Sequence, residues 1–185
     1  TKAGVHGRHR GMDVTKEGRV PIEYDVVGID PGTEVTAWVR LDHKCRCVKG
    51  HAIESNETVL GRILEWQRGP RRPRVGIEMI ESFGMPVGKE IFETVWWIGR
   101  YCQADREATR VTRRDVKLHV CGQMRGVNDS TIRQAMLDRY GPGREKAIGK
   151  KKSPGPLYGI RKDEWQALAL AVTFFDCELT GSDDK

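Results

Sequence analysis

Residues Val27 to Thr33 read VGIDPGT, a short apolar run that meets an acid and then the turn dipeptide Pro31-Gly32. This pattern predicts a β-strand that ends at Asp30. Glu78 stands inside a similar apolar run, VGIEMI, and Asp163 begins KDEWQALALA, a predicted helix with an almost wholly apolar interior. Burying an acid without a partner is costly, so three acids beside core segments predict bound cations. Carboxylate oxygens suit Mg²⁺ or Mn²⁺, and the pattern therefore suggests a metal-dependent nuclease.

The composition is consistent with a polyanionic partner. The chain has 185 residues and a formal net charge of +6, with a pI near 9.2. A basic balance alone is weak support for nucleic-acid binding, because many basic proteins bind none. The length is most simply one domain with a tail.

The cysteines and the hydropathy indicate the compartment. There are five cysteines, an odd count without a CxxC pair, which predicts free thiols in a reducing compartment. No apolar run reaches the length of a membrane span, and the N-terminus has charge without an apolar signal core. We therefore expect a soluble cytoplasmic protein with no membrane partner.

The periodicity predicts an α/β fold in which a mixed central sheet is flanked by helices. Residues 1–24 are expected to form a basic, flexible tail, residues 25–178 the folded domain, and residues 179–185 a C-terminal tail. The predicted strands are Asp25 to Asp30, Val35 to Leu41, Cys45 to Ala52, Arg74 to Ile80 and Thr109 to Thr112. The predicted helices are Glu57 to Gln67, Lys89 to Ala104, Asn128 to Tyr140 and the segment that begins at Lys162.

The segment between Gly143 and Lys162 carries seven basic residues against the single acid Glu145. Its glycines and prolines argue against a helix, so we expect a flexible basic loop. Phosphate contact is favoured because the loop precedes Asp163 directly, and a solvated spacer is the alternative. The candidate DNA-binding residues of this loop are Lys150, Lys151, Lys152 and Lys162.

Four segments carry a resemblance to a known family. VGIDPGT, VGIEMIESFGMPVGKEIFETVWWIGR (Val75 to Arg100), TRRDVKLHVCG (Thr112 to Gly122) and GIRKDEWQALALA (Gly159 to Ala171) are similar, in this order, to RuvC-type Holliday junction resolvases, in particular to the phage-encoded branch. The resemblance implies an RNase H-like fold and a homodimer. It also implies cleavage of two opposing strands of a four-way DNA junction with Mg²⁺, in the cytoplasm of a bacterial host.

The resemblance also implies roles for the three acids. Asp30 matches the aspartate of the first strand that bridges the metals, Glu78 the second acid, and Asp163 the acid that opens the last helix. Two cations about 4 Å apart can activate a water and stabilise the leaving oxygen of a phosphodiester. We expect two Mg²⁺ per site, with Mn²⁺ able to substitute, and a close approach of the DNA backbone to Gly32.

Other matching positions imply contacts with DNA. Lys117 is interpreted as a catalytic contact to a phosphate or to the leaving oxygen, with Arg113 and Arg114 as contacts to the DNA backbone. A surface turn with scattered basic residues is the alternative for this stretch. Phe83 has the placement of the aromatic residue that resolvases insert at the junction centre, although an ordinary core phenylalanine fits its neighbours nearly as well.

The chain departs from the family pattern at two places. Gln166 stands where cellular resolvases usually have a further acid, and an amide binds a divalent cation less well than a carboxylate does. Glu164 is an alternative ligand in place of Gln166, but it is rotated by about 100° around the helix and is rather expected to be solvated. Glu81 becomes a ligand instead of Glu78 if the strand register is shifted. Asn128 replaces a lysine that the family often has.

The helix Lys89 to Ala104 is the candidate dimer interface, because its apolar residues cover more than the single stripe that one sheet buries. Trp96 and Trp97 are adjacent and point to different faces, so one is expected in the core and the other at the interface. A charged substitution at Trp97 is the expected test.

Two alternatives to a junction resolvase remain open. One is another RNase H-like nuclease that cuts hybrids, flaps or forks. The other is a catalytically weak junction-binding protein, which Gln166 favours.

Overall fold

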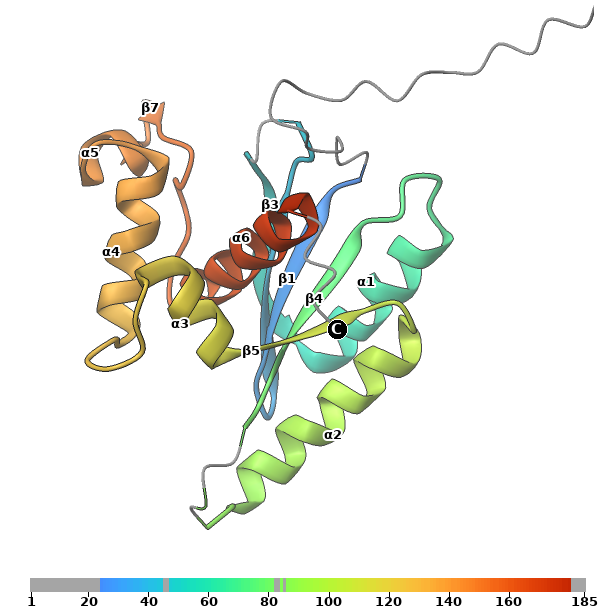
Figure 1. The fold of residues 1–185 in the computed structure, drawn as a ribbon. Helices are drawn as coiled ribbons and strands as arrows, with labels where there is room; N and C mark the ends of the chain where they lie inside the picture. The colour runs from blue at the N-terminus through green and yellow to red at the C-terminus, as the bar shows by residue number, and fades with distance from the viewer. Residues whose placement is uncertain (1–23, 45–46, 82–83, 85, 181–185) are drawn as a thin grey trace, which may run out of the picture.

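The structure is a computed structural model that describes residues 24–44, 47–81, 84 and 86–180. Its centre is a five-stranded sheet with the order β3-β2-β1-β4-β5 (Figure 1). Strands β1 to β3 are antiparallel neighbours, whereas β1, β4 and β5 are parallel. The strands are β1 (Val26–Pro31), β2 (Val35–Leu41), β3 (Val48–Ser55), β4 (Arg74–Met79) and β5 (Thr109–Thr112).

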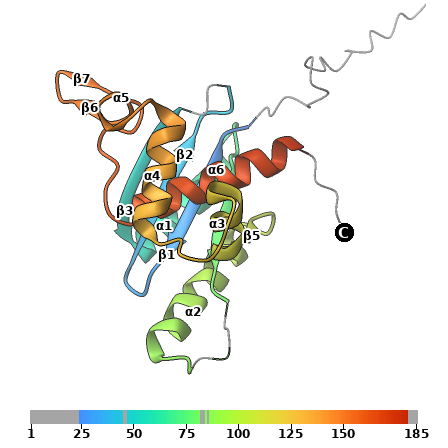
Figure 2. The ribbon, with the colours of Figure 1, turned by 60° about the vertical axis from the view of Figure 1, so that its left-hand side comes forward.

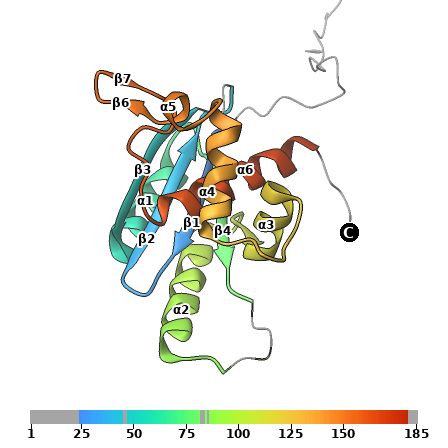
Figure 3. The ribbon, with the colours of Figure 1, turned by 90° about the vertical axis from the view of Figure 1, so that its left-hand side faces the viewer.

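Helices cover both faces of this sheet, as the sequence predicted (Figures 2 and 3). One face packs against α1 (Asn56–Arg68) and α2 (Lys89–Ala104). The other face packs against α6 (Glu164–Thr180), and α3 (Arg113–Cys121) and α4 (Asp129–Tyr140) pack on α6 in turn. None of the helices in the described part of the chain is long and apolar enough to cross a membrane.

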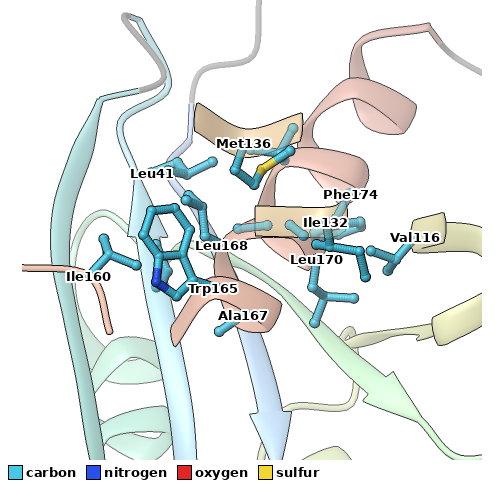
Figure 4. Packing of buried hydrophobic residues seen from close by; sticks show 14 of the residues in the cluster. Leu41, Val116, Ile132, Met136, Ile160, Trp165, Ala167, Leu168, Leu170 and Phe174 are labelled. Atoms are coloured by element: carbon cyan, nitrogen blue, oxygen red, sulfur yellow. The ribbon is translucent and has the colours of Figure 1, made fainter. Parts of the chain in front are cut away.

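The strand alternation separates two hydrophobic cores. Val27 and Ile29 of β1 join the core beneath α1 and α2, while Val26 joins the core beneath α6. Side chains two residues apart in a strand share a face, so Gly28 and Asp30 also point toward α6. Figure 4 shows the α6 core, in which Trp165, Leu168 and Phe174 pack among side chains of the strands and of α3 and α4.

Two glycines let α6 lie unusually close to the sheet. A Cβ atom built at Gly28 would lie 2.3 Å from the backbone oxygen of Ala167 and 2.5 Å from the backbone nitrogen of Ala171. A Cβ atom at Gly76, in the neighbouring strand β4, would lie 3.0 Å from the ring of Phe174. The helix backbone therefore occupies the space that side chains fill at other positions of the sheet.

The basic segment 143–162 is not the irregular loop that was expected. It begins with a short helix, α5 (Arg144–Ala147), and continues into a hairpin of β6 (Gly149–Lys150) and β7 (Ser153–Pro154). Gly149 adopts a φ of 72° where its backbone contacts Ser153 and Gly155 closely. The glycines and prolines that argued against a helix thus serve a tight hairpin.

The structure also describes the two ends of the folded part and four of the five cysteines. Of the expected N-terminal tail only Tyr24 is described, and its hydroxyl donates a hydrogen bond to Glu178 at the far end of α6. Helix α6 runs to Thr180, two residues into the expected C-terminal tail. Cys102 and Cys121 are free thiols, as predicted, and Cys45 lies outside the described residues.

The close approach of α6 generates a stability prediction. Gly28→Ala should destabilise the protein by about 3 kcal/mol or more, because its methyl group overlaps backbone atoms that have no room to move. The matched control is Gly61→Ala in α1, where nothing lies within 4 Å of the added carbon. That change should stabilise the helix by about 0.5–1 kcal/mol. Urea denaturation measures the free energy of unfolding of both variants. An equal change in the two would show that the contact between Gly28 and α6 is not tight.

Candidate active site

Asp30 and Glu78 lie side by side at the carboxyl ends of two parallel strands. Ile29 of β1 pairs with Ile77 of β4, so the acids that follow occupy adjacent positions. Both continue the face of the preceding glycines Gly28 and Gly76, which is the face that α6 covers. The charge of Glu78 and its hydrogen-bonding interaction with Asp30 raise the pKa of the Asp30 carboxyl. The strand register therefore brings Glu78, and not Glu81, next to Asp30.

Asp163 reaches the same place from the last helix. It immediately precedes α6, and its backbone oxygen accepts hydrogen bonds from the amides of Gln166 at 2.9 Å and Ala167 at 3.1 Å. Its charge acts on Asp30. Three acids separated by most of the chain length thus converge where β1, β4 and the start of α6 meet.

This convergence affects the pKa of Asp30. Burial raises the pKa of the Asp30 carboxyl well above its usual range, and the charges of Glu78 and Asp163 raise that pKa further. The positive charge of Arg113 acts in the opposite direction. A proton on Asp30 satisfies its contact with Glu78 and lowers the repulsion among the three acids.

Arg113 is the cation that compensates the acids. Its Nη1 atom lies 3.3 Å from Glu78 Oε1, and its Nη2 atom donates to Asp129 at the start of α4. A capping box between Thr112 and Asp115 begins α3 directly after β5 and so fixes the position of Arg113. The sequence had suggested a DNA contact for Arg113; the structure pairs it with an active-site acid.

The donor set fits divalent cations. Carboxylate oxygens from three elements are suitable ligands for Mg²⁺ or Mn²⁺, and the ion pair of Arg113 with Glu78 shows that a positive charge is stabilised there.

A tighter group of possible ligands, Asp25, Asp42 and His43, lies elsewhere and has another explanation. Asp25 accepts from Arg40 Nη2 at 2.7 Å and pairs with Lys49 at 3.1 Å. Burial acts to raise the pKa of Asp25, but hydrogen bonds from His43, Arg40 and Lys49 outweigh it, and the net pKa is lowered. The protein's own cations therefore already compensate this group, which joins β1, β2 and the turn between β2 and β3.

The turn that follows Asp30 is held by a buried polar network. Asn56 donates to the backbone oxygens of Gly32 at 3.0 Å and Thr33 at 2.9 Å. Its side-chain oxygen accepts from Thr36, whose hydroxyl lies 2.9 Å from that of Tyr101. A Cβ atom at Gly32 would lie 2.6 Å from the Val35 oxygen, so the turn itself requires this glycine. The close DNA approach proposed for Gly32 is not needed to explain it.

The expected basic residues of α3 lie beside Glu78. Glu78, Glu81, Arg113, Arg114 and Lys117 line one pocket of about 250 Å³. Arg113 and Lys117 are four residues apart and share a face of the helix. Arg114 and Glu81 are exposed. Phe83, the candidate wedge residue, lies outside the described residues.

The expectation that Glu164 is solvated is wrong. Its side chain is 1% exposed and lies 2.9 Å from Nδ1 of His51 in β3. Its second oxygen accepts from the Arg161 amide at 2.7 Å. Glu164 thus anchors the segment before α6, in which Lys162 has a φ of 47° that non-glycine residues rarely adopt.

Gln166 and Asp163 line a second pocket, of about 520 Å³, between α4 and the segment before α6. Gln166 is buried, and its amide side chain stands on the same side as Asp163. Sequence reasoning missed the other polar residues at this pocket, among them Arg133 and Arg161.

Comparison with known proteins agrees with this architecture. No family model matches the chain, and no curated protein matches it significantly in sequence. Among solved structures, Thermus thermophilus RuvC in complex with a Holliday junction substrate matches with a TM-score of 0.60 and 18% identity, over 85% of this chain and 97% of that one. Another structure of Thermus thermophilus RuvC matches with a TM-score of 0.56 and 17% identity, over 84% and 96% of the two chains.

The fold is that of RuvC. It is the α/β RNase H-like fold that the four segments predicted, and the likeness extends over nearly the whole RuvC chain. At 18% identity the likeness concerns the fold, and the roles of the individual residues are proposals.

Arg113 generates a prediction about metal binding. Arg113→Gln should lower the Mg²⁺ concentration needed to stabilise the protein against heat by roughly tenfold, because a cation that competes for Glu78 is removed. Arg114→Gln is the matched control, since Arg114 is exposed and makes no ion pair within the described residues. Thermal melting over a Mg²⁺ series measures the effect. A higher Mg²⁺ requirement in Arg113→Gln would mean that the arginine supports the metal-binding geometry.

Proposed function

We propose that the protein is a structure-selective DNA endonuclease that resolves four-way junctions by hydrolysing phosphodiester bonds. The convergence of Asp30, Glu78 and Asp163 at one edge of a RuvC fold is the observation that carries this proposal. A net charge of +6 supports a nucleic-acid substrate. The similarity of the four segments to the phage-encoded branch of these resolvases supports a phage origin and action in the cytoplasm of a bacterial host.

The three acids would hold two Mg²⁺ ions, which Mn²⁺ can replace, and Asp30 would be shared between them. When bound, such ions supply an activated water and stabilise charge on the leaving oxygen. The chain's own part is to position the acids: the glycine contacts fix α6 on the sheet, and Asn56 fixes the turn after Asp30. Lys117, with Arg114 beside it, would contact the phosphates next to Glu78.

The hairpin lysines Lys150, Lys151 and Lys152 would form a separate contact. In Figures 1 and 3 the β6–β7 hairpin lies near the C-terminal end of α4, whereas Asp129 at the start of α4 lines the same pocket as Asp163. The twelve residues of α4 span about 18 Å, which corresponds to roughly five nucleotides of a DNA strand. These lysines would therefore raise the affinity for DNA by contacting phosphates far from the site of cleavage. They would not offset the negative charge of Asp163.

A catalytically weak junction-binding protein is the second candidate, and Gln166 favours it. The amide occupies the position beside Asp163 where a carboxylate would bind a cation more strongly. The two candidates differ in whether the three remaining acids suffice for cleavage.

A cleavage assay separates these functions. Mobile four-way junctions, with each strand labelled in turn, should receive paired, symmetrical nicks in the presence of Mg²⁺. Asp30→Asn should lower the rate by at least a thousandfold, since several kcal/mol of charge stabilisation is lost, yet bind the junction as the wild type does. Glu34→Gln, an exposed acid just beyond the same turn, should cut normally. Cutting of RNA–DNA hybrids instead would indicate another RNase H-like nuclease, and tight binding without cutting a binding protein.

We further propose that the enzyme acts as a homodimer through α2. One set of three acids serves one strand at a time, so paired nicks need two chains related by a two-fold axis. Helix α2 exposes Phe92 (65%), Val95 and Trp96 (59%) along one stripe, whereas Trp97 is only 6% exposed and packs under the sheet. The earlier choice of Trp97 as the interface residue is therefore wrong, because that side chain belongs to the core.

The interface has its own prediction. Trp96→Glu should shift the mass measured by light scattering from about twice the 20.9 kDa chain mass toward one chain. Leu118→Glu, a similar change at an exposed apolar residue of α3, is the control and should leave the mass unchanged. A dimer that persists in Trp96→Glu would contradict the interface assigned to α2.

A further inference from the structure

The pocket between α4 and α6 carries positive charge that the protein does not compensate. Ser130 and Arg133 of α4 line it on one side, and Arg161, Lys162, Asp163 and Gln166 line it on the other. Within the described residues none of its three cationic side chains makes an ion pair, whereas its other acid, Asp129, is held by Arg113. A basic hollow that shares Asp163 with the active site is suited to an anion that lies next to the reacting phosphate.

Arg133 is held in place by an aromatic ring, and within the described residues its charge has no acidic partner. Its guanidinium lies 5.0 Å from the ring centre of Trp165, a buried residue of the α6 core. Its Nε atom is buried and has no hydrogen-bond partner in the described part of the chain. A guanidinium that is stacked on an aromatic ring has little freedom to lose on binding, and its planar edge matches two oxygens of a phosphate.

The other side of the pocket, formed by the segment from Arg161 to Asp163, is also held in place. Glu164, bound to His51, accepts a hydrogen bond from the Arg161 amide and so orients the segment from Arg161 to Asp163. Lys162 is the one non-glycine residue with a positive φ among those described, and such a conformation persists where the surrounding contacts determine it. The backbone thereby presents Arg161 and Lys162 beside Asp163 while both side chains remain exposed.

We propose that this α4–α6 pocket binds a backbone phosphate of the DNA strand that is cut, next to the scissile phosphate, with Arg133 as its planar donor and Arg161 and Lys162 as flanking cations. The inference rests on the proposed nuclease function, which supplies the position of the scissile phosphate. Because DNA phosphates follow one another along the strand, a phosphate in this pocket sets the register of the strand against Asp163.

Binding of plain duplex DNA and of a four-way junction, in EDTA and over a series of KCl concentrations, tests the pocket. Arg133→Gln should weaken both affinities by about tenfold and reduce the slope of log affinity against log salt by about 0.9, the value for one lost phosphate contact. Arg133→Lys should keep most of the slope but lose affinity several-fold, because the charge stays and the planar fork is lost. Arg106→Gln, an exposed cation before β5 at the opposite end of the sheet, should change neither quantity.

An unchanged salt slope in Arg133→Gln, with an unchanged melting temperature, would overturn the proposal. If that variant melts early, Arg161→Gln gives the same measurement from an exposed side chain, and an unchanged slope there would overturn it equally. Inorganic phosphate at matched ionic strength distinguishes the source of the anion. The pocket takes a free phosphate, and the proposal fails, under two conditions. Inorganic phosphate would have to protect the wild type but not Arg133→Gln against heat, and the wild type and the variant would have to bind DNA equally well. These measurements use DNA that is not cut, so they stand apart from the test for paired nicks.

Discussion

The close contact between α6 and the central strands is the constraint on which the rest of the site depends. Gly28 and Gly76 leave space for the helix backbone and for Phe174, and any side chain at Gly28 would overlap Ala167 or Ala171. Because side chains alternate along a strand, the acid two residues after each glycine must emerge on the helix side, just beyond the contact. Packing that stabilises the core therefore also sets the distance between Asp163 and the two strand acids.

Such convergence places like charges together, and the protein's own groups offset part of their repulsion. The raised pKa of Asp30 reflects its burial and its acidic neighbours, and Arg113 offsets part of their charge. The same arginine joins α3 to the start of α4 through Asp129. The ion pair of Arg113 with Glu78 and the affinity of Glu78 for a divalent cation are thus opposed, since the arginine that satisfies the acid would also compete for it.

Much of this arrangement could be predicted from the sequence, and the errors have physical causes. Local apolar runs gave the five strands and the positions of Asp30 and Glu78, because strand periodicity is a local property. Side-chain partners that come from distant segments were not predictable: Glu164 meets His51 across more than a hundred residues, and Trp97 instead of Trp96 faces the core. Helix α3 was missed because its capping box at Thr112 follows a strand without any intervening loop.

Gln166 is consistent with this balance of charge. Burial and the two acids Glu78 and Asp163 already raise the pKa of Asp30 well above its usual range, and a further carboxylate beside Asp163 would raise it more and leave more repulsion for Arg113 to offset. The amide of Gln166 keeps an oxygen that can coordinate a cation near Asp163 without adding a negative charge. Because Arg133, Arg161 and Lys162 carry uncompensated charge along the same pocket, the neutral Gln166 also leaves the surface beside Asp163 more attractive to a phosphate. Glutamine in place of an acid at position 166 thus lowers the affinity for a cation and raises the affinity for a phosphate. The proposed reaction uses both a bound cation and a bound phosphate.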